Sequence, residues 1–212
     1  MHELLLAVAY AEAGEVDRPR AMLGKAPHTP VGARTMAVLS ATPDEAWRWY
    51  AHSWNLTTAG PPSVEPAEVT SRLVRNVADE MLQFLVGQLP GAASGHADTT
   101  SVWFVRLRAM SDSAAAAASD TSDTQLLVQA MLSAAEGEYG AAMGVLGGNC
   151  FPTLGRGRDV LISLWRACAE GRVAKAKGAA LTPVEARRAR AAAPVPRSIG
   201  CPYATLYCEQ YW

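Results

Sequence analysis

The sequence of 212 residues is poor in several kinds of side chain, and each shortage excludes a class of protein. Aromatic residues make up 7% of the chain and charged residues 18%. No apolar run approaches the about 18 to 20 residues that a membrane-spanning helix needs. The apolar residues 4–11 follow His2 and Glu3 rather than a basic segment, so we expect no signal peptide. These observations predict a soluble, cytoplasmic protein.

The residues that usually carry catalysis or bind metals are few and scattered. The four cysteines form no C-x-x-C pair and have no histidine at zinc-finger spacing, which predicts neither a metal site nor a disulfide framework. The four histidines lie in different segments, away from any nucleophile motif. We therefore expect no catalytic residues, no cofactor and no metal. The cysteines are Cys150, Cys168, Cys201 and Cys208, and the histidines are His2, His28, His52 and His96.

A possible exception is the pair Cys201 and Cys208, whose spacing of seven would place both on one face of a helix. A redox pair is one interpretation of this spacing. Cysteines that pack as small apolar residues are the interpretation we prefer. An unrecognised cysteine enzyme is therefore an alternative, although we expect no enzyme.

Alanine is the residue that the chain has in excess. Its 40 alanines are about a fifth of the sequence, and alanine has the highest helix propensity of all residues. Small side chains also let helices approach one another closely. The composition therefore predicts an all-α fold of closely packed helices.

The N-terminal segment reads as two helices joined by a tight turn, over residues 3–25. Gly14 separates the two apolar phrases and suits the left-handed position at a helix end. Pro19 lies near the start of the second helix, where the first N–H groups have no intrahelical partner. We therefore predict a helical hairpin here.

Three further helices are indicated before residue 110. Thr42-Pro43-Asp44-Glu45 is typical of a capped helix start. Apolar residues spaced by three and four over 69–85 predict an amphipathic helix that ends near Pro90. Residues 101–110 form another apolar helical phrase. The Ser/Asp/Ala-rich residues 111–124 contain nothing large to bury, and we interpret them as a linker with a transiently helical alanine run.

The first hairpin pattern occurs twice more after this linker. One phrase consists of residues 125–136, Gly137 and residues 138–146. The next phrase consists of residues 159–170, Gly171 and residues 172–180. The two glycines are 34 residues apart. Small residues flank each of them, which lets paired helices approach. In the first phrase we expect Ala130 and Ala142 to meet across the hairpin.

A period of 34, a glycine between paired helices and small residues on both sides resemble the tetratricopeptide repeat (TPR). The resemblance implies an α-α superhelix of stacked hairpins. It also implies a chain organised as an N-terminal helical region at 1–110 with one hairpin at 3–25, the linker at 111–124, and hairpins with a terminal helix at 125–212. Proteins of this class are interaction scaffolds rather than enzymes.

Several phrases are also similar to the C-terminal repeat region of the TPR-containing twelfth subunits of TRAPP, a vesicle-tethering complex. The last phrase retains Thr205, Tyr207 and Glu209 of a helix typical of that family. The resemblance implies a subunit of a tethering complex in endoplasmic-reticulum-to-Golgi transport, associated with those membranes. The phrases are residues 74–89, 102–110, 125–146, 164–176 and 202–209.

Two groups of residues are candidates for contacts with other protein subunits. Tyr203, Tyr207 and Tyr211 recur every four residues beside the final Trp212, which would place an aromatic stripe on a terminal helix. That helix would either pack on the preceding hairpin with one edge exposed or complete an interface with another subunit. The cluster Trp47, Trp49 and Trp54 could form a binding platform, although packing between repeats is the interpretation we prefer.

The second group is basic and consists of Arg187, Arg188 and Arg190. Residues 156–197 carry ten Lys/Arg against three Asp/Glu, whereas residues 1–155 carry nine against sixteen. The charge is thus polarised although the formal net charge is only -1. We expect these arginines to form a solvated helix face that suits an acidic partner subunit. The alternatives are a generic peptide-binding TPR adaptor and an arginine-mediated nucleic-acid-binding protein, and we do not expect nucleic acid as a partner.

Overall fold

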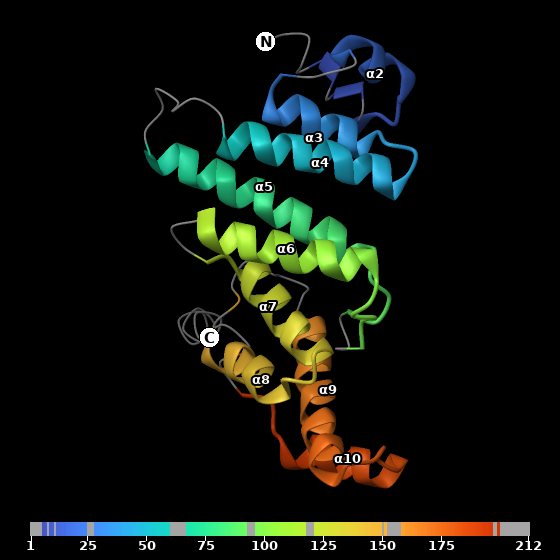
Figure 1. The fold of residues 1–212 in the computed structure, drawn as a ribbon, viewed down its shortest axis with the longest axis vertical. Coiled ribbons are helices and arrows are strands. Elements are labelled where there is room, and N and C mark those ends of the chain that lie inside the picture. The colour runs from blue at the N-terminus through green and yellow to red at the C-terminus, as the bar shows by residue number, and fades with distance from the viewer. Residues whose placement is uncertain are drawn as a thin grey trace, which may run out of the picture. The chain divides into compact units, whose positions relative to one another are not determined.

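The structure is a computed structural model that describes residues 6–7, 9–10, 12–24, 28–59, 67–92, 96–117, 121–149, 151, 158–196 and 199 (Figure 1). In these ranges every regular element is a helix and there is no strand, which confirms the predicted all-α class. No helix among these residues has the length and apolar character needed to cross a membrane. The chain divides into two compact units, Met1–Met81 and Leu82–Trp212, which are described separately.

The described residues form nine helices, and neighbours along the chain pack in pairs within each unit. The boundary between the units falls within α5. The domain division predicted on either side of residues 111–124 remains a prediction. The helices are α2 (Asp17–Leu23), α3 (Pro30–Val38), α4 (Pro43–Thr58), α5 (Ala67–Gly87), α6 (Val102–Ala117), α7 (Asp123–Ala135), α8 (Tyr139–Gly148), α9 (Arg158–Lys177) and α10 (Pro183–Ala192).

The first unit begins with the turn predicted at Gly14. Gly14 has φ 82°, and the N–H of Glu15 donates to the carbonyl of Tyr10 at 3.0 Å, which closes the turn. Pro19 is buried in the first turn of α2, where its missing N–H removes no intrahelical hydrogen bond. The turn and the helix that contains Pro19 are therefore confirmed.

Helices α3 and α4 form a hairpin whose two members start in the same way. Thr29 and Thr42 each precede a proline at the first helical position and accept a backbone N–H with the side-chain oxygen. This confirms the helix start predicted at Thr42. The two helices pack on each other, and the hydroxyl of the fully buried Ser53 in α4 donates to the carbonyl of Pro30 in α3 at 2.9 Å.

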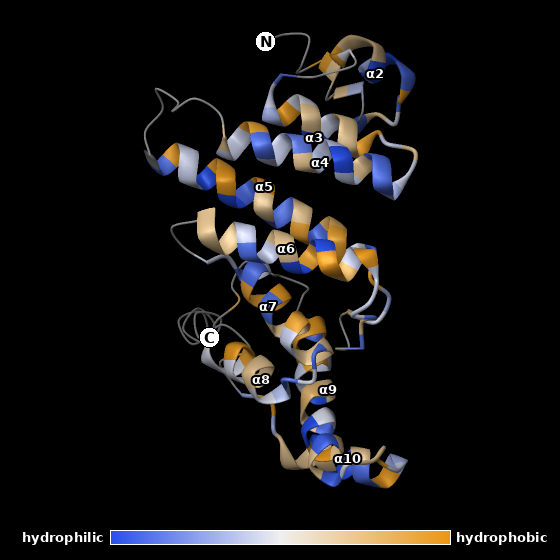
Figure 2. Ribbon diagram, in the orientation of Figure 1, coloured by the Kyte–Doolittle hydropathy of each residue, from blue (hydrophilic) through white to orange (hydrophobic). Residues whose placement is uncertain are grey.

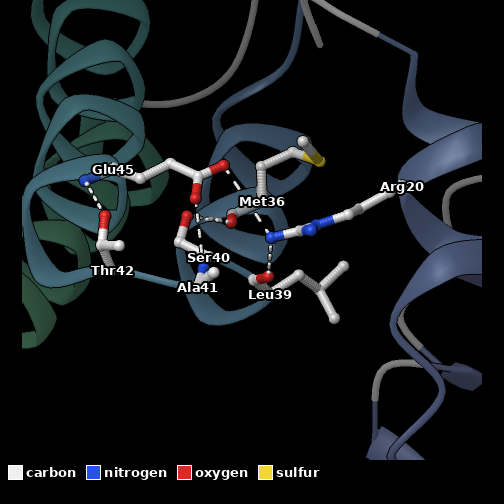
Figure 3. Close-up of polar contacts among 7 residues, drawn as sticks. All are labelled: Arg20, Met36, Leu39, Ser40, Ala41, Thr42 and Glu45. Atoms are coloured by element: carbon white, nitrogen blue, oxygen red, sulfur yellow. Dashed lines mark hydrogen bonds and ion pairs between the residues drawn. The ribbon is translucent and has the colours of Figure 1, made fainter.

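Arg20 ties α2 to the connection between α3 and α4 (Figure 3). Its guanidinium donates to the carbonyl of Leu39 and lies 3.8 Å from the carboxylate of Glu45. The same carboxylate accepts the N–H of Ala41 at 3.1 Å. One cation thus satisfies a carbonyl at the end of α3, where no intrahelical donor is available, and also approaches an acid in the first turn of α4.

A second polar contact joins α3 to the part of α5 that belongs to this unit. Arg34 donates through two guanidinium nitrogens to the two carboxylate oxygens of Glu80, the fork-like geometry that arginine favours with carboxylates. Tyr50 of α4 is buried nearby. Burial raises the pKa of Tyr50, and the negative charge of Glu80 raises it further while Arg34 opposes that effect.

In the second unit, α6 continues past residue 110, where the sequence predicted that the helix would end. It includes the alanine run and stops at Ala117. Ser111 and Ala114 are buried, so small side chains supply a packed face although they offer nothing large to bury. The high helix propensity of alanine accounts for the extension. The first part of the predicted linker at 111–124 is thus helical, and α7 begins at Asp123.

The hairpin predicted around Gly137 is present as α7 and α8. Ser122 and Gln125 form a reciprocal capping box at the start of α7, with bonds of 3.1 and 3.0 Å. Gly137 has φ 77°, and the N–H of Glu138 donates to the carbonyl of Ser133 at 2.8 Å. Ala130 and Ala142 are fully buried, one on each of these packed helices, as close approach requires.

The hairpin predicted around Gly171 is wrong. Gly171 lies inside α9, which continues without a turn to Lys177. A Cβ at this position would overlap the ring of Tyr139 from α8. The glycine is therefore explained by the close approach of an aromatic ring rather than by a turn, and the spacing of 34 from Gly137 does not mark a second turn of the same kind.

The turn after α9 lies at Gly178, which has φ 69°. Helix α10 then starts at Pro183 and packs on α9. The indole Nε1–H of Trp165 in α9 donates to the carbonyl of Ala193 at 3.2 Å, which holds the end of α10 against α9. Helix α7 contacts both α8 and α9, so α7 to α10 pack in succession.

Candidate interaction surfaces

The structure places only one of the two predicted groups of interaction residues. Tyr203, Tyr207, Tyr211 and Trp212 lie outside the described residues. Arg187, Arg188 and Arg190 are exposed on α10. Hydrophilic and hydrophobic residues are both present on this helix, as Figure 2 shows.

Helix α10 is positioned by a network around Glu185. The carboxylate accepts a hydrogen bond of 2.6 Å from Lys177 of α9 and one of 2.7 Å from the N–H of Thr182. Thr182 in turn caps the N–H of Glu185. The Lys177 bond first, and then the Thr182 bonds, lower the pKa of Glu185 to about 2. The charged form of this carboxylate therefore fastens the start of α10.

The three arginines of α10 differ in their surroundings. Arg190 forms an ion pair with Glu170 of α9, and Arg187 donates to the carbonyl of Pro183 at 3.3 Å within its own helix. Arg188 extends from the same helix and is exposed. The group therefore combines one arginine that fastens α10 to α9 with two that face solvent, rather than a continuous cationic surface.

A groove of about 390 Å³ runs along one face of α9, and we call it the α9 groove. Its wall contains the Glu170–Arg190 ion pair, so the packing of α10 on α9 helps to shape it. The lining residues are His96, Asp159, Ile162, Ser163, Arg166, Ala167, Glu170 and Arg190.

His96 reaches the groove from the segment that follows α5. Its N–H donates to the carbonyl of Gly91 at 3.0 Å, and Gly91 has φ 80°. A Cβ at Gly91 would lie 3.0 Å from the carbonyl oxygen of His96, so the close approach of the two backbone segments favours glycine here.

Charges of both signs are open in the α9 groove. Asp159, Ser163 and Arg166 are exposed and follow one another at helical spacing on the same face of α9. Arg166 forms no ion pair within the described part of the chain. An extended polypeptide carries hydrogen-bonding groups along its backbone and charged side chains, which a hydroxyl, a carboxylate and a guanidinium in a row can bind.

A smaller hollow of about 340 Å³ lies where the α7–α8 turn faces α9. Lys175 donates to the carbonyl of Gly137 at 2.9 Å and to the carboxylate of Glu138 at 3.2 Å. Its ammonium group is thus already engaged by the turn. We attribute a structural role to Lys175, because it compensates a carbonyl at the end of α7.

The remaining candidates do not form a reactive site among the described residues. Cys168 is fully buried, and burial raises the pKa of its thiol to about 11, so the reactive thiolate is disfavoured. Cys168 therefore packs as a small apolar residue. Cys150, Cys201 and Cys208 lie outside the described residues, so the interpretation of the pair Cys201 and Cys208 remains a prediction. The described residues contain no cluster of His, Cys, Asp and Glu that could hold a metal ion.

The tryptophans of α4 are only partly exposed. Trp47, Trp49 and Trp54 are each half-buried. Trp49 packs edge to face on His52 of the same helix, with the ring centroids 6.0 Å apart. Partial burial agrees with the packing role preferred from the sequence.

Sequence reasoning missed the α9 groove, although a signal was present. Asp159, Ser163, Arg166 and Glu170 recur at intervals of four, three and four, which is the spacing of one helix face. Comparisons of the chain with protein-family models, with curated proteins and with solved structures give no match.

Proposed function

We propose that the protein is a non-catalytic interaction scaffold of TPR-like hairpins, and that its α9 groove binds an extended segment of a partner protein. The observation that carries the proposal is the row of open polar and charged groups on α9, held in a groove by a packed α10. Rigid helical elements present these groups without a loop, which favours binding of one extended chain.

The succession of helices supports the TPR-like part of this proposal. Helices α7 and α8 form one hairpin, and α9 and α10 form the next. The first helices of the two pairs, α7 and α9, also contact each other, as successive hairpins in a stack do. In this register the second turn is at Gly178 rather than at Gly171.

The finer proposal is a subunit of a TRAPP-like tethering complex in endoplasmic-reticulum-to-Golgi transport, located in the cytoplasm at those membranes. It rests on the sequence phrases that resemble that family. One of these phrases, 164–176, is a continuous stretch of α9. This phrase therefore supports the resemblance as a single helix and not as a helical hairpin. The alternative of a generic peptide-binding adaptor uses the same groove with another partner.

The test is affinity purification of the tagged full chain from its own cells, followed by mass spectrometry. We compare the native chain with Arg166→Glu, which reverses the open charge in the groove, and with Arg48→Glu, which reverses an exposed charge on α4. We expect Arg166→Glu to lose partners that Arg48→Glu retains. Tethering-complex subunits among those partners would support the finer proposal, and identical partners for all three chains would contradict a role for the groove.

A nucleic-acid role is the alternative that the exposed Arg187 and Arg188 motivate. Binding through phosphates weakens steeply as the salt concentration rises. We expect no such binding, because the Glu170 and Glu185 carboxylates lie beside the basic residues of this region. Submicromolar, strongly salt-dependent binding of RNA at physiological ionic strength would place this alternative above the scaffold.

A further inference from the structure

Two of the carboxylates and guanidinium groups that line the α9 groove are open to a partner. Glu170 and Arg190 neutralise each other between α9 and α10. Asp159 and Arg166 are exposed, and their side chains form no ion pair or hydrogen bond within the described residues. A partner that complements this groove therefore brings a positive charge to Asp159 and a negative charge to Arg166.

The distance between these two charges favours one conformation of the partner. Asp159 and Arg166 are seven residues apart in α9, so they lie on nearly the same face, about 10.5 Å apart along the helix axis. In a polyproline II segment, residues three positions apart share a face and are about 9.3 Å apart. In a β-strand, residues on one face are about 6.6 Å or about 13 Å apart. The polyproline II spacing matches the groove best.

The residues between the two charges also suit such a segment. Ile162 and Ser163 line the groove there. Ile162 is half-buried and offers an apolar surface to proline rings, and the exposed hydroxyl of Ser163 forms no hydrogen bond within the described part of the chain. A polyproline II backbone has no internal hydrogen bonds, so its carbonyls can accept from this hydroxyl. A partner helix could match a spacing of seven residues, but its carbonyls are already bonded within the helix.

Arg190 keeps Arg166 available to a partner. Glu170 follows Arg166 by four residues in α9, a spacing at which opposite charges pair on a helix. Glu170 is instead bound by Arg190 of α10. Without Arg190, the Glu170 carboxylate would be free to bind Arg166 and would compete with an acid of the partner. Arg190 is therefore a positioning residue of the groove.

We propose that the α9 groove binds a polyproline II segment that carries an acidic and a basic residue three positions apart, with the acid on Arg166 and the base on Asp159. The spacing is recognised rather than the order, because the segment can lie in either direction along α9. The inference rests on the proposed function and deepens it by naming the chemistry of the partner segment.

Fluorescence anisotropy with the purified full chain and labelled peptides tests the spacing. Two probes carry Glu-Pro-Pro-Lys or Lys-Pro-Pro-Glu between proline flanks. The matched control has the same composition with the order Glu-Pro-Lys-Pro, which places the charges two positions apart and on different faces. A fourth probe is an alanine-based helical peptide with Glu and Lys seven positions apart. At pH 8, where ordinary histidine side chains are uncharged, we expect the better of the first two probes to bind about fivefold more tightly than the control and the helical probe.

Charge reversal in the protein tests the two contacts. Arg166→Glu and Asp159→Lys should each weaken binding of the better probe by about fivefold. Arg48→Glu, which changes an exposed charge on α4, should leave binding unchanged. The double variant Asp159→Lys/Arg166→Glu should restore binding, because the segment can then lie in the opposite direction. Damage to the fold by either substitution would not be repaired by adding the other.

A further pair of variants tests the role of Arg190. Arg190→Met should weaken binding of the better probe several-fold, because Glu170 is then free to pair with Arg166. Adding Glu170→Gln should restore binding, since the competing charge is removed. If Arg190 acted only by packing α10 on α9, Glu170→Gln would restore nothing, because glutamine cannot rebuild the ion pair with a methionine.

Several results would overturn the inference. They are equal binding of the better probe and its control, tighter binding of the helical probe, no binding of any probe, and a double charge reversal that binds no better than the single variants. The proposed function is judged separately, by the partners that Arg166→Glu loses in cells. Lost partners without probe binding mean that the groove takes a segment of other chemistry. Probe binding as expected without lost partners contradicts the proposed function alone.

Discussion

The two hairpins α3–α4 and α7–α8 are held to their neighbours by different kinds of contact. Around α3–α4, long polar side chains reach from one helix to another, with Arg20 bound to the carbonyl of Leu39 and Arg34 bound to Glu80. Around α7–α8, small residues make the closest contacts, although Lys175 of α9 also reaches the turn between the two helices. Ala142 is fully buried, and Gly171 admits the ring of Tyr139.

The difference shows that each region should respond to a different kind of substitution. A guanidinium that reaches across several ångströms can be replaced with modest loss, since half-exposed ion pairs contribute little to stability. A contact that depends on the absence of a side chain fails as soon as one is added. Changes in volume should therefore matter more around α7–α8 than the loss of an ion pair does around α3–α4.

The largest effect is expected from Gly171→Leu. The new side chain would occupy the space of the Tyr139 ring, and we expect a loss of about 3 kcal/mol in the free energy of unfolding. Urea denaturation measures it. Adding Tyr139→Ala to the Gly171→Leu chain should recover part of the loss, because the leucine side chain can then occupy the space that the tyrosine ring has left. If Gly171 were a turn, as the sequence suggested, Tyr139→Ala would recover nothing.

Ala142→Leu tests the packing of α8 on its neighbours. Ala142 is fully buried, and overpacking there should cost about 1 to 3 kcal/mol. The melting temperature of a chain shown to be folded by circular dichroism is the measurement. Ala141→Leu is the matched control, because Ala141 is exposed on the same helix and should change stability little. An unchanged melting temperature for Ala142→Leu would argue against the close approach of α7 and α8.

Arg34 and Glu80 test the polar contact in the first unit, with side chains 25% and 40% exposed. We expect Arg34→Met to cost about 1 kcal/mol, and less at high salt. The pKa of Tyr50, followed by NMR, gives a second readout. It should fall in Glu80→Gln and rise in Arg34→Met, because the two charges act on it in opposite directions. Shifts in the same direction would contradict the arrangement.

The smallest effect is a pH dependence confined to α10. The pKa of Glu185 is about 2 in the folded chain, whereas its ordinary value, which applies in the unfolded chain, is 4.5. Its stabilising effect is therefore complete above about pH 4.5 and is lost as the pH falls toward about 2. We expect the amide signals of α10 to show fraying in that window. Glu185→Gln should remove this pH dependence while leaving the signals of α7 unchanged.

Helix ends were predictable from the sequence where a local signal is sufficient. Whether a given glycine forms a turn or lies inside a helix was not predictable. Gly14 and Gly137 both follow a helical phrase and both have positive φ. Gly171 has the same sequence neighbourhood, yet it lies within a helix because Tyr139 packs on it from α8. A contact between two helices leaves no mark in the local sequence around the glycine, so spacing misled the prediction there.

Other features could have been found and were not. Thr182-Pro183-Val184-Glu185 repeats the pattern of Thr42-Pro43-Asp44-Glu45 and marks the start of α10 just as the latter marks α4. The α9 groove was visible as a polar face on one helix, but its wall depends on the Glu170–Arg190 pair between two helices. A pairing of that kind follows from tertiary packing and cannot be derived from a single segment.

Three helices, α3, α4 and α10, begin with threonine followed by proline. The consequence lies in the denatured chain rather than in any native contact. A proline ring fixes φ before the chain folds, so fewer backbone conformations have to be abandoned at that residue. The residue before it is also kept away from helical angles, so a helix cannot easily extend backward through the threonine. The denatured ensemble is thereby biased toward the native starting point of each of these helices. Helices that start at other residues are less populated, even before any two helices pack on each other.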